Sequence, residues 1–139
     1  MQPDLDPAWT ALRDELVAAG ALADGTNVLL RRANRAVVIA STTIAGRPTI
    51  LVLAPIARAA DCDADRALVL AKDLELGAII VVGGMVALRH VMASTTTSTA
   101  ILDVATHLAH SAALLAPALI DRTRTRSTEV TTAFAHCAE

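Results

Sequence analysis

Apolar residues between positions 28 and 92 fall into five runs of strand length. Side chains alternate between the two faces of a strand, so a strand with one wet face should alternate apolar and polar residues. Residues 36–44 barely alternate in this way, and neither do residues 49–53 or 78–82. A sheet built from such strands is apolar on both faces, so each face needs a cover. The chain has too little helix to cover both, and we expect the second cover to be another protein.

The first predicted element is an amphipathic helix over residues 7–19. Trp9, Leu12 and Leu16 recur at helical spacing, and Asp6 stands where an N-cap is expected. Residues 28–32, 36–43 and 49–53 then read as three strands joined by short turns. Three consecutive strands with short links predict an antiparallel meander.

Pro55 should end the third strand, because proline cannot donate to a sheet ladder. A second helix is predicted from a cap at Asp61 or Asp63 to about Leu76, with Leu68 on its buried stripe.

Residues 78–82 and 85–92 form a predicted hairpin across two adjacent glycines, which allow the positive φ angles of a tight turn. The polar residues 94–99 suit a loop and an N-cap. The last helix should run from about residue 99 to 116 and end or kink at Pro117.

This order of elements predicts an α+β fold: one curved antiparallel sheet with helices packed mainly on one face. We expect a single domain over residues 1–120 and a mobile tail over residues 121–139, where the helical periodicity is lost.

Composition excludes several classes of function. A net charge of -2 gives no electrostatic footprint for nucleic acid, and one Trp and one Phe are too few for base stacking. The N-terminus lacks the features of a signal peptide, and polar residues interrupt the longest apolar stretch, residues 100–120. We therefore expect a cytoplasmic protein with no membrane or nucleic-acid partner.

No catalytic motif emerges from the sequence. His107 and His110 share one helix face, which a metal could use, but no further ligands accompany them. His90 has no nucleophile pattern beside it. Cys62 lies near a helix start, where neighbouring aspartates oppose activation of the thiol. We expect no enzyme activity, no metal and no cofactor.

Three stretches resemble the type III secretion chaperones of the Tir-chaperone (CesT-like) family. They are residues 51–56 (LVLAPI), 67–77 (ALVLAKDLELG) and 86–92 (VALRHVM). The resemblance spans residues 5–116 and implies a non-catalytic homodimer that holds an extended segment of a client protein. The estimated isoelectric point of 6.0 is a departure, since members of that family are usually distinctly acidic.

Two hypotheses follow from the exposed sheet and the resemblance. The first is a chaperone or adaptor whose dimer forms through the uncovered sheet face, or through the second helix with the last hairpin. The alternative is an accessory or scaffold subunit that partners an enzyme of a biosynthetic pathway, such as ribosomal peptide modification. We expect client contacts at six apolar positions: Leu12, Leu16, Ile50, Val52, Val86 and Leu88.

Overall fold

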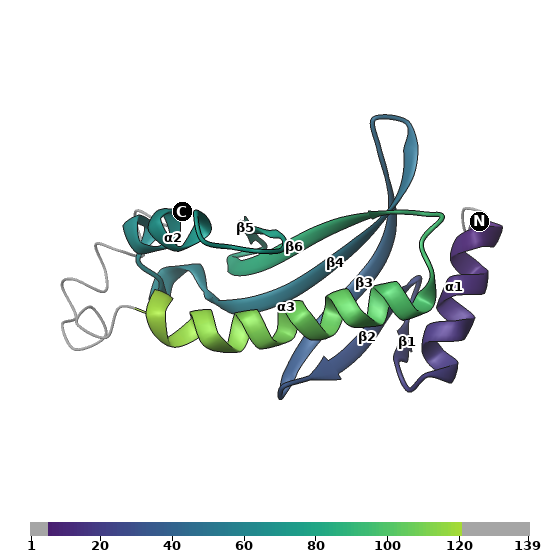
Figure 1. The fold of residues 1–139 in the computed structure, drawn as a ribbon, viewed down its shortest axis with the longest axis horizontal. Helices are drawn as coiled ribbons and strands as arrows, with labels where there is room; N and C mark the ends of the chain where they lie inside the picture. The colour runs from purple at the N-terminus through teal and green to yellow at the C-terminus, as the bar shows by residue number, and fades with distance from the viewer. Residues whose placement is uncertain (1–5, 121–139) are drawn as a thin grey trace.

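The structure, a computed structural model, describes residues 6–120. Its elements are α1 (Pro7–Ala18), β1 (Leu22–Asp24), β2 (Asn27–Arg32), β3 (Arg35–Ile44), β4 (Arg47–Arg58), the 3-10 helix η1 (Ala59–Asp61), α2 (Ala64–Ala71), β5 (Ala78–Val82), β6 (Met85–Ala93) and α3 (Ser98–Leu119). The strands form one antiparallel sheet in the order β1-β2-β3-β4-β6-β5 (Figure 1). The predicted α+β class and the rough order of its elements are confirmed, with the short strand β1 as an addition.

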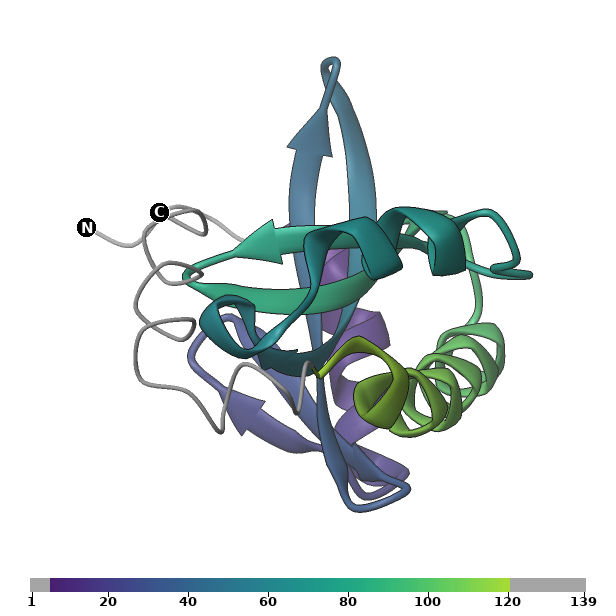
Figure 2. The same ribbon diagram turned by 90° about the vertical axis from the view of Figure 1, so that its left-hand side faces the viewer.

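The helices lie on one face of the sheet. Helix α3 packs against β2, β3, β4 and β6, while α1 packs beside its start and α2 beside its end (Figures 1 and 2). The helix side of the sheet is therefore the side that holds the core.

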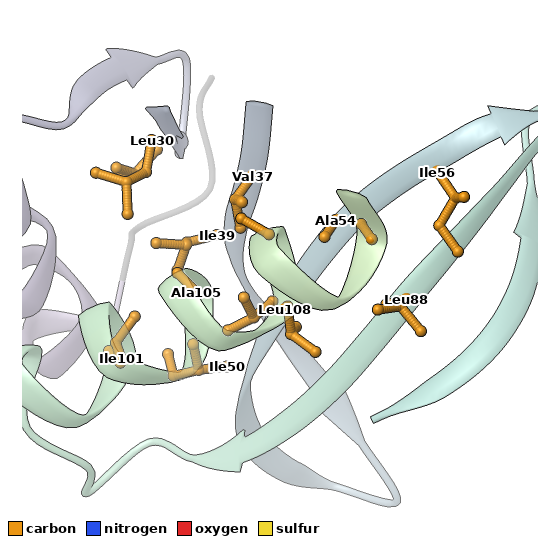
Figure 3. Close-up of a cluster of buried hydrophobic side chains, with 14 of the residues drawn as sticks. Leu30, Val37, Ile39, Ile50, Ala54, Ile56, Leu88, Ile101, Ala105 and Leu108 are labelled. Atoms are coloured by element: carbon orange, nitrogen blue, oxygen red, sulfur yellow. The ribbon is translucent and has the colours of Figure 1, made fainter. Parts of the chain in front are cut away.

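The core is built from alternate residues of the central strands and one face of α3. Its side chains include Leu30, Val37, Ile39, Ile50, Ala54, Leu88, Ile101, Ala105 and Leu108 (Figure 3). Each of these is at most 2% exposed. Burying one Ile or Leu side chain contributes roughly 1.5–3 kcal/mol, so this layer supplies the main stabilisation of the fold.

Helix α1 begins where the sequence predicts. The Asp6 carboxylate accepts a hydrogen bond from the backbone N–H of Ala8 at 3.1 Å. Trp9, with Leu12 and Leu16, is buried against the core. The Trp9 indole N–H donates to the carbonyl oxygen of Thr26 at 2.9 Å, so the helix is tied to the β1–β2 turn.

Pro55 does not end its strand as predicted, because β4 continues to Arg58. Strands β3 and β4 pair only as far as Leu53, so the missing N–H of Pro55 costs no hydrogen bond to β3. The register with β6 shifts between Pro55 and Ala57, and the Arg35 guanidinium donates to the Pro55 carbonyl at 3.2 Å.

Helix α2 begins at its predicted cap, where the Asp63 carboxylate accepts hydrogen bonds from two backbone amides. It ends at Ala71, well before the predicted end near Leu76. None of its residues is buried, so packing gives a longer helix little support. The chain turns after α2 and brings Leu74 and Leu76 against the core, whereas Leu68, predicted to be buried, is 68% exposed.

Helix α3 contains Pro117 within its last turn, so the predicted end near residue 116 is wrong by one turn. Its N-cap is Thr97, whose hydroxyl accepts from the N–H of Ala100 at 3.1 Å. The predicted mobile tail, residues 121–139, lies outside the described residues.

Helix α3 is also long and apolar enough to cross a membrane, and a third of its most apolar window is buried in the fold. Core helices share this composition. The outer side of α3 exposes Asp103, His107 and His110, which are costly in a bilayer, so its contacts with the sheet favour a core role.

Gly77 provides a test of how closely β5, β6 and α3 approach. Its φ is +83°, and an added Cβ would lie 2.9 Å from the Arg89 carbonyl oxygen and 3.2 Å from the Leu108 side chain. Gly46, at the tip of the projecting β3–β4 hairpin, has a similar φ of +78° with no atom within 4 Å. We predict that Gly46→Ala lowers the free energy of unfolding by about 1 kcal/mol and Gly77→Ala by at least twice as much.

Urea unfolding followed by Trp9 fluorescence measures both values. Equal losses in the two variants would contradict the close approach at Gly77.

Candidate protein-binding surfaces

The face of the sheet opposite the helices has no element packed on it among residues 6–120. One cross-strand row on this open face runs over all the strands: Leu22, Leu29, Val38, Leu53, Arg89 and Ala78. A second row consists of Ala40, Leu51 and Val91. Leu22 is 69% and Val91 43% exposed, and the other large apolar side chains of both rows are half-buried. A contiguous apolar surface of this kind is typical of a protein-binding site.

The six predicted client contacts lie on the other side, inside the core. Leu12, Leu16, Ile50, Val52, Val86 and Leu88 are each at most 7% exposed. The four strand residues point toward the helices, and the two helix residues pack into the same cluster. In this conformation a client has no access to them, which argues against direct contact. Their strand neighbours, such as Leu51 and Leu53, occupy the open face instead.

A second apolar surface lies where α2 meets β5. We call it the α2–β5 patch and define it by four side chains that are 48–68% exposed: Leu68, Val69, Val81 and Val82. A hollow of about 320 Å³ separates the two elements, and its lining includes Cys62, Ala67 and Ile79. Leu68 and Val81 also line the hollow, so these two exposed side chains and the hollow form one apolar surface.

Strand β5 is also an edge of the sheet, since within the described residues it pairs only with β6. Its sequence, AIIVV, contains no charge and no proline. Edge strands of soluble proteins are usually protected by such residues, because their free N–H and C=O groups invite another strand. An unprotected apolar edge therefore marks a pairing surface.

His107 and His110 lie in a separate hollow of about 400 Å³, together with Asp73 and Glu75. Neither histidine has a hydrogen bond or an ion pair with these carboxylates. Across residues 6–120 no group of three His, Cys, Asp or Glu side chains could hold a metal ion. The hollow therefore brings together polar side chains without assembling an acid–base pair.

Two further residues of chemical interest belong to the structural framework. His90 is half-buried on β6, where it pairs with Val52 on the helix side. Cys62 is buried beside α2, and burial raises the pKa of its thiol, with a further increase from the negative charge of Asp61. A thiol with a raised pKa stays protonated at neutral pH and is a poor nucleophile.

Comparison of the chain with protein-family models and with curated proteins finds no match. The assignment of a function therefore depends on the two apolar surfaces.

The raised thiol pKa predicts slow alkylation of Cys62. In a Cys137→Ser background, which leaves one thiol, iodoacetamide at pH 8 should modify the folded protein at least about tenfold more slowly than free glutathione. Urea should abolish the difference. A rate equal to that of glutathione in the folded protein would show an accessible, activated thiol.

Proposed function

We propose that this chain is a small non-enzymatic chaperone or adaptor that holds an extended segment of a client protein on its open sheet face. The observation that carries the proposal is the row that crosses the whole sheet, apolar except for Arg89, without a cover among residues 6–120. An extended segment can follow the rows of side chains across the sheet, so it would cover more of this surface than a folded partner of the same size.

The energetics favour a bound segment. Full burial of a leucine contributes roughly 1.5–3 kcal/mol, and Leu22, Leu29, Leu51 and Leu53 all retain exposed surface here. Part of this gain is lost in ordering the segment and in association entropy. A client segment that covers several of these leucines would still keep a net favourable binding energy.

We further propose a homodimer through the α2–β5 patch. Two copies that pair through their β5 strands would satisfy the free edge groups and bury Val81 and Leu68 at a two-fold axis. This arrangement leaves both open faces available, so dimer formation and client binding use different surfaces. It agrees with the dimer and the client binding that the family resemblance implies.

The homodimer is tested by sedimentation equilibrium of variants with one new charge in the patch. We expect wild-type protein to sediment as a dimer, and Leu68→Glu or Val81→Glu to shift it to monomer, because a carboxylate would be buried without a partner. Leu114→Glu is the matched control: Leu114 is 79% exposed and lies outside the patch. A monomeric wild type, or dimers in all variants, would contradict this interface.

Client binding is tested by photo-crosslinking in the native host. A benzophenone amino acid at Leu22, on the rim of the open face, should capture the client, and the same group at Leu114, on the helix side, should not. Replacing Leu51 and Leu53 by Thr should then reduce capture at Leu22 severalfold, because the apolar contact area is lost. Equal capture at both positions, or none at Leu22, would contradict the proposed surface.

A further inference from the structure

The open face carries two arginines within its apolar surface. Arg89 belongs to the row that crosses all the strands, and Arg31 pairs with Ala36 on the next row. Among residues 6–120, neither guanidinium has an ion pair or a hydrogen bond. The rim of the face holds Asp24, on the β1–β2 pair, and Arg58, which pairs with Asp61 at 3.5 Å. The unpaired charge within the face is therefore positive.

Both arginines are surrounded by apolar groups. Arg31 lines a hollow of about 500 Å³ with Leu22, Leu29 and Ala36, and Arg89 lies between Leu53 and Ala78 across the strands. A purely apolar segment laid over this face would strip water from two guanidiniums and offer only backbone carbonyl oxygens in return, with no opposite charge. An unpaired charge that loses its water costs several kcal/mol, so such a segment would bind poorly.

We propose that the segment held on the open face is acidic as well as apolar, with two carboxylates that pair with Arg31 and Arg89. This inference rests on the proposed function and specifies the chemistry of the client. A carboxylate can accept two parallel hydrogen bonds from one guanidinium. This pairing orients the carboxylate and also neutralises the charge of the arginine.

The geometry of the sheet sets the spacing of these carboxylates. Arg31 on β2 and Arg89 on β6 are three strand intervals apart, about 14 Å, and two residues out of register along the strands, about 7 Å, so their backbones are about 16 Å apart. An extended chain advances about 3.3 Å per residue, so this distance corresponds to about five positions, and the long arginine side chains can bridge the difference to a spacing of about four. Positions i and i+4 of a strand point to the same side, which allows both carboxylates to face the sheet.

Two other occupants fit these charges less well. A second copy of this chain, packed face to face, would bring four like-charged arginines into one apolar interface. Single-stranded nucleic acid binds through stacked aromatic rings, which the rows of the open face do not contain. An acidic peptide segment is the partner that satisfies both the apolar rows and the charges.

The test uses three twelve-residue peptides with an alternating Val/Thr background and Glu, Gln or Lys at positions 4 and 8. Fluorescence anisotropy with the full chain measures their affinities. We expect the Glu peptide to bind at least about tenfold more tightly than the Gln peptide, and the Lys peptide to bind most weakly. In the double variant Arg31→Glu/Arg89→Glu the preference should reverse, so that the Lys peptide binds most tightly.

The control variant is Arg66→Glu/Lys72→Glu, which makes the same change of net charge at exposed positions of α2 and its C-cap, on the helix side, and should keep the wild-type order of affinities. Trp9 emission reports whether each variant is folded. Equal binding of all three peptides, before and after charge reversal, would overturn the acidic specificity and leave the proposed function standing. No binding of any peptide would overturn both. Binding to anionic lipid vesicles that depends on Arg31 and Arg89, without peptide binding, would overturn the peptide assignment in favour of a membrane surface.

Discussion

The packing of α3 along one face of the sheet is the constraint on which the remaining structure depends. This helix contacts four of the strands and both other helices, so it joins the core into one cluster. Helices α1 and α2 pack against the two ends of α3, so all three helices lie on the same side of the sheet. The other side is left with apolar rows and no cover among residues 6–120. One packing event therefore creates both the stable core and the surface available to a partner.

The two apolar surfaces differ in the chemistry they offer. The α2–β5 patch combines exposed aliphatic side chains with free backbone groups of an edge strand, which suits symmetric pairing of two copies. The open face combines aliphatic rows with Arg31 and Arg89, which suits an unlike partner that brings the opposite charge. A protein with both surfaces can form a dimer and still present its full sheet to a client.

Much of the fold could be predicted from local signals. Asp6 and Asp63 marked helix starts, and Gly83 and Gly84, with φ of +55° and +76°, marked the last hairpin. Strand β1, with three residues, was too short to give a pattern, and the early end of α2 depends on tertiary packing that no local signal records.

The face proposed to hold a client could not be predicted from alternation, because Ile50 and Val52 are as apolar as Leu51 and Leu53. A signal was nevertheless present on β6: Arg89 alternates in phase with the exposed Val91 and out of phase with the buried Leu88, and a charged residue there marks the side that lacks a helix. The measurement that tests the central claim most directly is methyl NMR of the full chain with a soluble paramagnetic agent. We predict strong broadening of the Leu51 and Leu53 methyl signals and protection of Ile50 and Val52. Protection of Leu51 and Leu53 in the purified protein without a client would contradict an open face.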